Sequence, residues 1–358
     1  MENLKEEFMG IALKTAQEAK NISYPNPMVG AILLKDGEII GKGTTQEAGR
    51  NHAEISAIDD VKKNFPLGWG KKIKDSSLYV TLEPCSKTGR TPPCSEEIVK
   101  NKIKEVFIGS LDPSQNGMKK LEALDLKVES GILKKETDKH HRGFLTRINT
   151  KKPFVKCKIA CSIDGGMALK NGESKWITSK ASRNDAHQVR HESDAILTGI
   201  GTVLSDDPKM TVRHINTEKQ PIVCVLDTEL RLNGREEIFN RETNSYIFSK
   251  RDNKKINNQR VRVKTVDIKD GALNLKQILE ILAEEGVSEL MIEAGPKLVA
   301  SFINEDLIDE YIFYLAPKVM GKNKISFLDF NKNLNNIALQ FTKTAVLDCD
   351  LKIIARRT

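Results

Sequence analysis

The sequence predicts an α/β protein built from two domains. Its 358 residues exceed one average domain, and two domains of about 150–200 residues are the expectation. One alternation of helix and strand patterns fills the first part of the chain, and a second begins after a basic connector over 140–152. We place the boundary near residue 148, with a first domain over 1–147 and a second over 148–358.

In the first domain, an amphipathic helix opens the chain because its apolar residues recur on one helical face, namely Leu4, Phe8, Ile11, Ala12 and Ala16. The remaining elements are predicted in the order hairpin 29–41, helix 52–61, strand 77–82, helix 94–100 and strand 106–110. Pro92-Pro93 suits the start of the helix at 94, where backbone donors lack partners. Such an order implies a sheet covered by helices.

In the second domain, short apolar runs alternate with amphipathic segments. Strands are predicted at 154–159, 195–198, 222–227, 245–248, 261–266, 289–293 and 310–315, with a further strand-like segment at 345–354. Helices are predicted at 179–191, 275–285 and 297–304. No repeat or low-complexity segment interrupts this order.

Composition places the chain among globular cytoplasmic proteins. Apolar residues make up 39% and charged residues 30%, a balance typical of a folded chain. No apolar run is long enough for a membrane span, and the acidic amino terminus does not resemble a signal peptide. The six scattered cysteines form no disulfide framework, so we expect a reducing compartment.

The net charge of +8 is open to three interpretations. The first is a solvated surface, which fits the segment richest in basic residues, 251–264. The second is attraction of a small anionic substrate, and the third is binding of a nucleic acid. Aromatic residues make up 5% of the chain and do not alternate with basic runs, which argues against a base-stacking surface.

The most informative pattern is His52-Ala53-Glu54 followed by Pro84-Cys85 and Cys94. One imidazole and two thiolates leave the fourth tetrahedral position of Zn²⁺ open, which is typical of a catalytic site, and Glu54 would move protons beside it. The pattern resembles that of zinc deaminases, although their two cysteines are two residues apart and here eight residues intervene. A structural zinc would need a fourth ligand, for which we find no candidate at suitable spacing.

The segment between the two cysteines carries groups that bind phosphate. Lys87 and Arg90 lie in it together with several hydroxyl side chains, which predicts a phosphate-bearing substrate beside the metal.

Polar and glycine-containing turns follow several predicted strands of the second domain. Gly199-x-Gly201 and Glu293-Ala294-Gly295 are of this kind, and such turns can bind phosphate groups through backbone N–H donors. Some polar positions of the second domain also have a purely structural interpretation. Gly199-x-Gly201 and Asp206-Asp207-Pro208 could be simple turns, and Trp176 could be a core residue.

Four motifs of the first domain resemble the RibD family of bifunctional riboflavin-biosynthesis enzymes. They are Pro25-Asn26-Pro27-Met28-Val29-Gly30, His52-Ala53-Glu54, Thr81-Leu82-Glu83-Pro84-Cys85 and Gly89-Arg90-Thr91-Pro92-Pro93-Cys94. The resemblance implies a cytidine-deaminase-like three-layer α/β/α domain that deaminates 2,5-diamino-6-(ribosylamino)pyrimidin-4-one 5′-phosphate. Zinc would be held by His52, Cys85 and Cys94, with Glu54 as proton shuttle, while Asn26 would orient the pyrimidine.

The second half is similar to the reductase half of the same family, which implies a dihydrofolate-reductase-like α/β domain. NADPH would reduce the ribosyl group of the deaminated product to ribityl by hydride transfer to C1′. The resemblance assigns NADPH contacts to Ala160, Trp176, Thr202, Asp206, Thr228, Gly295, Pro296, Lys297, Leu298, Val299, Ala300 and Ser301. It assigns substrate contacts to Ser174, Arg190, Met210, Arg213 and Glu293, to which the first domain adds Asn26, Lys87 and Arg90.

Two positions depart from the family pattern. Lys87 and Thr88 stand where the family usually has histidines, and the segment after Asp112-Pro113 is shorter than usual. We expect a cytoplasmic homo-oligomer that acts on a small phosphorylated pyrimidine and binds neither nucleic acid nor membrane. The alternatives are a nucleic-acid-editing zinc deaminase with a non-catalytic second domain, and a regulator that keeps a degenerate reductase domain.

Overall fold

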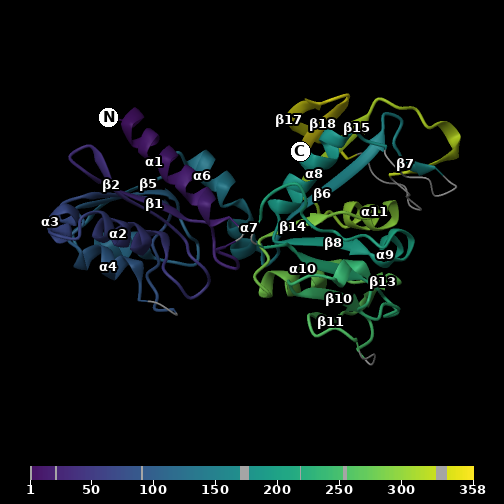
Figure 1. The fold of residues 1–358 in the computed structure, drawn as a ribbon, viewed down its shortest axis with the longest axis horizontal. Helices are drawn as coiled ribbons and strands as arrows, with labels where there is room; N and C mark the ends of the chain where they lie inside the picture. Colours follow the sequence, from purple (N-terminus) through teal and green to yellow (C-terminus); the bar gives the residue numbers. More distant parts are fainter. Residues whose placement is uncertain are drawn as a thin grey trace. The chain divides into compact units, whose positions relative to one another are not determined.

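The computed structural model describes residues 2–20, 22–89, 92–169, 177–217, 219–252, 256–327 and 337–358. The chain forms two compact units, Met1–Lys151 and Lys152–Thr358 (Figure 1). Within the described ranges, every helix is too short or too polar to cross a membrane.

The first unit is built on a five-stranded mixed sheet with the order β2-β1-β3-β4-β5, in which β3, β4 and β5 are parallel and β1 is antiparallel to both of its neighbours. Its elements are α1 (Glu2–Ala16), η1 (Gln17–Ala19), β1 (Gly30–Lys35), β2 (Glu38–Thr44), α2 (Ala53–Asn64), α3 (Trp69–Ile73), β3 (Ser77–Leu82), α4 (Cys94–Lys100), β4 (Glu105–Ser110), α5 (Gly117–Glu122), β5 (Lys127–Ser130), α6 (Lys134–His140) and α7 (Arg142–Thr150).

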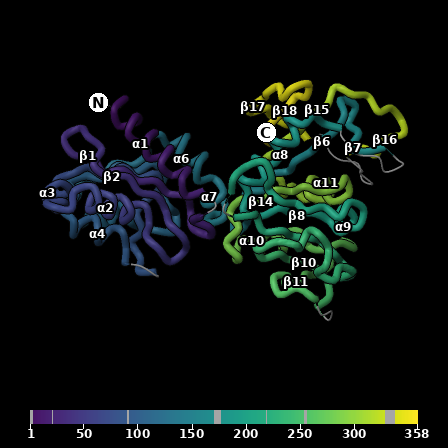
Figure 2. Tube along the Cα trace, in the orientation of Figure 1, coloured from purple at the N-terminus to yellow at the C-terminus, as the bar shows by residue number. Residues whose placement is uncertain are grey.

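Helices cover both faces of this sheet. The core of one face joins the strands to α2, α4 and α5, and the core of the other face contains residues of α1 with Leu133, just before α6. The amino-terminal helix α1, purple in Figure 2, packs along β1. Alternate side chains of each strand enter opposite cores, as the two-residue period of a strand requires. The unit is therefore a three-layer α/β/α domain.

The second unit contains a nine-stranded sheet with the order β11-β10-β9-β8-β14-β6-β15-β18-β17. Its elements are β6 (Phe154–Ser162), β7 (Gly166–Leu169), α8 (Lys180–His191), β8 (Ala195–Gly199), α9 (Ile200–Asp206), β9 (Ile222–Leu226), η2 (Glu237–Phe239), β10 (Ser245–Ser249), β11 (Val261–Thr265), β12 (Ile268–Lys269), β13 (Ala272–Leu273), α10 (Leu275–Glu284), β14 (Glu289–Ile292), α11 (Pro296–Asn304), β15 (Glu310–Ala316), η3 (Gly321–Asn323), β16 (Lys324–Ser326), β17 (Leu339–Leu347) and β18 (Asp350–Arg357).

The strands from β11 to β15 are parallel, and the last two strands, β18 and β17, are antiparallel. Helices α10 and α11 pack on one face of the sheet, while α8 and α9 pack on the other. Both faces of the parallel strands are thus buried, which explains why they are nearly continuous apolar runs in the sequence.

The structure confirms the α/β class and the predicted helices and strands of both units to within a few residues at each end. The segment 345–354 is strand-like as predicted, but it belongs to two strands, because β17 ends at Leu347 and β18 begins at Asp350. Asp348 has a positive φ of 59° in the two-residue turn between them. Short apolar runs lie on both sides of that turn, at 345–347 and 353–355, so the hairpin resembles one strand in the sequence.

Candidate active sites

Helix α2 places His52 and Glu54 at the end of the first sheet. His52 is the N-cap residue of this helix and Glu54 lies in its first turn. The helix packs directly on the backbone of β2, because a Cβ added to Gly43 would lie 2.1 Å from the Ala57 nitrogen. Glycine at this position therefore allows a close approach that fixes the start of α2.

His52, Cys85 and Cys94 converge, with their potential ligand atoms all within 4.8 Å of one another. His52 Nδ1 lies 3.6 Å from Cys85 Sγ and 3.3 Å from Cys94 Sγ. A tetrahedral zinc ion with ordinary Zn–N and Zn–S bonds separates nitrogen and sulfur by about 3.5 Å. The three residues thus fit a Zn²⁺ ion without rearrangement, as donors of the right type at the right separation.

The two thiols share a proton that a metal ion would replace. Their mutual hydrogen bond lowers the pKa of Cys85, helped by His52, and raises that of Cys94. The Cys94 backbone N–H also donates to Cys85 Sγ at 3.2 Å. Cys85 is therefore ready to bind a cation as thiolate, and metal binding would release the proton of Cys94.

Glu54 is 4% exposed and lies beside these donors. Burial, with a further contribution from the nearby Cys85 sulfur, raises the pKa of its carboxyl group to about 7. A carboxyl group with a pKa near neutrality can both accept and donate a proton at physiological pH. Its environment therefore suits the role of proton shuttle.

A cavity of about 420 Å³ opens beside the donors. It has the size of a small-molecule site. Among its lining residues are the predicted Asn26, His52, Cys85 and Lys87, and also Arg50 and Gln115, which the sequence analysis did not single out. A basic residue two positions before His52 is the signal that could have drawn attention to Arg50. The predicted contact Arg90 lies outside the described residues.

The short segment after Asp112-Pro113 closes one wall of this cavity. Gln115 Oε1 accepts hydrogen bonds from the backbone N–H of Ser86 at 3.1 Å and from its hydroxyl at 3.3 Å. Lys87 Nζ donates to the Ser114 carbonyl at 2.7 Å. This segment therefore ties down the chain immediately after the ligand Cys85.

Two further contacts hold the same segment against the end of β3. The buried carboxylate of Glu83 accepts from the backbone N–H of Asp112 and of Met118, at 3.0 and 2.9 Å. Gly117 packs so closely that a Cβ would lie 1.8 Å from the Pro84 carbonyl oxygen. Glycine is required there by space.

The loop that carries Asn26 is fixed by hydrogen bonds from α6 and α7. His140 Nε2 lies 2.8 Å from the Met28 carbonyl, and Arg147 donates to the Pro25 carbonyl at 3.3 Å. These contacts hold the loop on both sides of Asn26, whose side chain lines the cavity.

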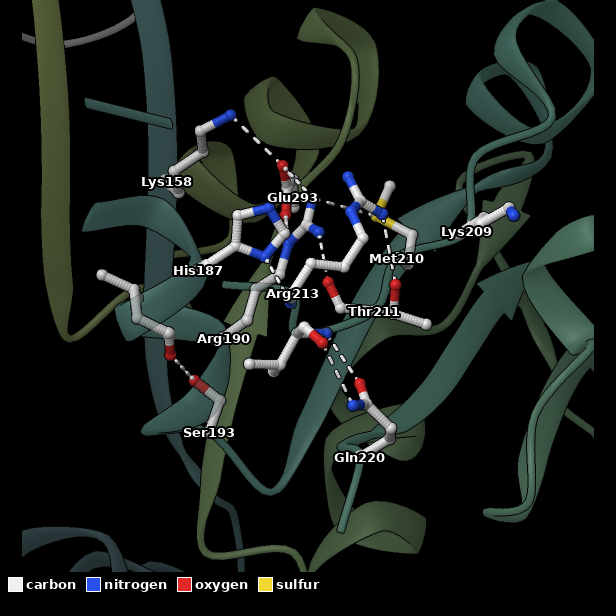
Figure 3. A network of polar contacts seen from close by, with 12 residues as sticks. Lys158, His187, Arg190, Ser193, Lys209, Met210, Thr211, Arg213, Gln220 and Glu293 are labelled. Carbon is white, nitrogen blue, oxygen red and sulfur yellow. Dashed lines mark hydrogen bonds and ion pairs between the residues drawn. The ribbon is translucent and has the colours of Figure 1, made fainter. Parts of the chain in front are cut away.

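In the second unit, the structure brings together Arg190, Met210, Arg213 and Glu293 (Figure 3). Arg190 Nε and Nη2 donate to the two oxygens of Glu293 at 2.8 and 3.0 Å, and Nη1 donates to the Thr211 carbonyl at 2.9 Å. A second cation, Lys158, lies 3.2 Å from the same carboxylate. The guanidinium fork of Arg190 is thus largely engaged within the protein.

Arg213 is exposed, unlike Arg190. Its Nη1 contacts the Thr211 hydroxyl at 3.2 Å, and its backbone N–H donates to His187 Nδ1 at 3.1 Å. Burial together with the adjacent arginines lowers the pKa of His187 to about 4, so its ring is a neutral acceptor at neutral pH. This bond holds the backbone of Arg213 in place while its side chain faces solvent.

The predicted NADPH contacts lie mostly at one edge of the nine-stranded sheet. Parallel β9, β8 and β14 all end at this edge, and Thr228, Thr202 and Gly295 follow them directly. Strands β8 and β14 are neighbours in the sheet. After β8 the chain continues to β9, toward one edge of the sheet, and after β14 it continues to β15, toward the other edge. In open α/β sheets, nucleotides bind outside the strand ends at such a switch point.

The remaining predicted contacts are distributed around this edge. Asp206 ends α9, and the segment Gly295 to Ser301 forms the start of α11. Leu298 reaches back to β8, since a Cβ on Gly199 would lie 3.4 Å from its Cδ2. Ala160 lies on β6 opposite Tyr314 of β15. Ser174 and Trp176 fall outside the part of the chain that the structure describes.

The fold and the donor set define the first unit as a zinc-dependent deaminase domain, which is followed along the chain by an α/β unit with a mostly parallel sheet. The comparisons agree: residues 2–110 match the cytidine and deoxycytidylate deaminase zinc-binding region, and residues 153–353 match the RibD C-terminal domain. The riboflavin biosynthesis protein RibD of Aquifex aeolicus is 37% identical over 356 residues, which cover 98% of each chain. RibD of Escherichia coli is 34% identical, with 89% of each chain covered.

Solved structures give the same result over the full length. RibD of Acinetobacter baumannii superposes with a TM-score of 0.90 at 30% identity, covering 100% of this chain and 99% of that one. A diaminohydroxyphosphoribosylaminopyrimidine deaminase/5-amino-6-(5-phosphoribosylamino)uracil reductase from Thermotoga maritima superposes with a TM-score of 0.89 at 30% identity and the same coverage. This chain belongs to the RibD family.

Proposed function

We propose that this chain catalyses two successive steps of riboflavin biosynthesis. The first is deamination of 2,5-diamino-6-(5-phosphoribosylamino)pyrimidin-4(3H)-one, and the second is reduction of the ribosyl group of 5-amino-6-(5-phosphoribosylamino)uracil by NADPH. The observation that carries the proposal is the convergence of His52, Cys85 and Cys94 beside buried Glu54 at a small cavity, in a member of the RibD family.

In the deamination step, His52, Cys85 and Cys94 hold the metal ion. When bound, Zn²⁺ supplies the Lewis acid that activates water for attack on the amino-bearing ring carbon. Glu54, buried beside these donors, would move a proton from the attacking water to the departing amine. Asn26 offers an amide that can donate and accept at the pyrimidine edge.

In the reduction step, NADPH supplies the hydride when bound, and the protein orients C1′ of the substrate against it. We place the NADPH site at the carboxyl ends of β8 and β14, because free backbone N–H groups at the start of α11 suit its phosphates. Glu293 fixes Arg190, so we assign Arg190 to shaping the substrate pocket. Exposed Arg213 then provides a guanidinium for the substrate phosphate.

We further propose that residues 1–147 form the deaminase domain and residues 148–358 the reductase domain, a division supported by the matched segments 2–110 and 153–353. A cytoplasmic location is supported by the free thiols of all six cysteines, which lie in the described residues. A homo-oligomer without bound nucleic acid is our proposal for the assembly. Phe341 and Val346 support self-association, because they are 63% and 74% exposed on the edge strand β17.

One assay tests both activities. The diaminopyrimidine phosphate is supplied to the zinc-loaded chain with and without NADPH, and the products are identified by mass. We expect ammonia and the deaminated ribosyl compound without NADPH, and the ribityl compound with it. Recovery of unchanged substrate in both reactions would contradict the proposal.

A further inference from the structure

The cavity beside the zinc donors has a positively charged lining. Arg50 and Lys87 contribute two cationic side chains, and none of the described residues that line the cavity is an aspartate or a glutamate. The two cations come from segments on either side of the donors, one just before α2 and the other just after Cys85. A cavity of this charge favours an anionic ligand.

The backbone of Arg50 is fixed relative to the metal donors. The loop before α2 is closed by a hydrogen bond from Gln46 N–H to the Asn51 carbonyl at 3.0 Å, and Arg50 N–H donates to the Glu47 carbonyl at 2.8 Å. The Asn51 side chain anchors the loop to Asp59 of α2 at 2.8 Å. Arg50 therefore starts from a defined position two residues before His52.

The guanidinium group of Arg50 has no ion-pair or hydrogen-bond partner in the described part of the chain, and we find no structural role for it. Lys87 differs, because its ammonium group donates to the Ser114 carbonyl. An arginine fork binds a phosphate through two parallel charge-assisted hydrogen bonds, and a lysine adds charge without that geometry. Arg50 is thus the described cavity residue best suited to bind a phosphomonoester.

We propose that Arg50 binds the phosphate group of the deaminase substrate and makes the first unit specific for the phosphorylated pyrimidine. The inference rests on the proposed deamination and names a residue that determines which substrate is accepted. Lys87, held by the Ser114 carbonyl, adds a second positive charge to the lining. Arg50 contacts the end of the substrate that does not react, so its contribution is to binding and is made equally before and during the reaction.

The test compares Arg50→Gln with the unmodified zinc-loaded chain in steady-state ammonia release. The substrates are the diaminopyrimidine phosphate and its phosphatase-treated, unphosphorylated form. For the phosphorylated substrate we expect KM to rise about 10- to 100-fold, the loss typical of hydrogen bonds to a charged group, with kcat nearly unchanged. KM for the unphosphorylated substrate should stay the same.

Two variants sharpen the result. Lys63→Gln removes one positive charge from the exposed side of α2, away from the cavity-lining residues, and should leave both KM values unchanged. Arg50→Lys should restore only part of the affinity, because it keeps the charge and loses the fork. Competitive inhibition by inorganic phosphate should weaken in Arg50→Gln by a factor similar to the rise in KM.

The outcomes separate this role from the proposed activity. If the unmodified chain deaminates the substrate and Arg50→Gln shows the same KM as Lys63→Gln, the role of Arg50 is refuted. A rise in KM of equal size for both substrates also refutes it, since the effect would then be independent of phosphate. Absence of ammonia release from the unmodified chain overturns the proposed function, and the role of Arg50 with it.

Discussion

Replacement of Glu54 by glutamine tests the chemistry of the first unit most directly. Glutamine has nearly the same size and shape as glutamate, so the buried position beside Cys94 stays filled. It cannot, however, accept and release a proton at neutral pH. The substitution therefore removes proton transfer while leaving the donors His52, Cys85 and Cys94 in place.

The expected loss follows from the surroundings of Glu54. The carboxyl group is 4% exposed, and none of the described residues that line the adjoining cavity carries a carboxylate. Nothing nearby can take over its function. Positioned general acid–base groups contribute about 10²- to 10⁴-fold to rate, which corresponds to about 2.7–5.4 kcal/mol of activation free energy. We expect kcat for ammonia release to fall by at least about 10²-fold.

The assay measures ammonia release, zinc per chain and NADPH oxidation on the same preparation. Zinc content should stay at the level of the unmodified chain, because Glu54 is not among the converging donors. Oxidation of NADPH, followed by absorbance with the deaminated compound as substrate, should be unchanged and serves as an internal control. Near-normal ammonia release in Glu54→Gln would remove this residue from the mechanism, and loss of NADPH oxidation would show that the two activities are not independent.

Three further perturbations have defined outcomes. Gly117→Ala places a Cβ 1.8 Å from the Pro84 carbonyl and should lower zinc per chain, whereas Gly89→Ala meets open space and should not. Glu293→Gln leaves buried cations unpaired and should cost the second unit about 3–5 kcal/mol in chemical unfolding. Burial raises the pKa of the Glu293 carboxyl, but its cationic partners lower it by more, to a net value below the usual 4.5. The ionised carboxylate therefore stabilises the second unit at neutral pH, and this stabilisation is lost on acidification. Glu293→Gln should lack that acid-dependent loss of stability. Removal of zinc by a chelator should abolish ammonia release and spare NADPH oxidation of the deaminated compound, and parallel loss of both would contradict separate sites.

The order of helices and strands along the chain was largely predictable, because the sequence patterns that indicate them are local. The apolar runs of β6, β8, β9 and β14 predict strands, and the structure places them side by side in one sheet. Prediction was incomplete where elements are short, as for α3 and β5, since a few residues carry little periodicity. It did not separate β17 from β18, because apolar runs lie on both sides of the two-residue turn between them.

The candidate sites were likewise predictable only in part. His52, Cys85 and Cys94 could be named as metal donors because each belongs to a short motif at a helix start or a strand end. The pairing of Arg190 with Glu293 could not be foreseen, since 103 positions separate them and both residues suited a substrate. Gln115 was missed because it meets Ser86, 29 positions away, only once the loop folds back.

The sequence by itself predicted His52, Cys85 and Cys94 as zinc donors and Glu54 as proton shuttle, because each belongs to a short motif of characteristic residue types. Only the tertiary structure decided how those groups are surrounded. It engages the guanidinium of Arg190 internally, leaves that of Arg50 at the cavity, and buries Glu54 deeply enough to raise its pKa. These outcomes depend on burial and on contacts between distant segments, which chain folding creates and local sequence does not contain.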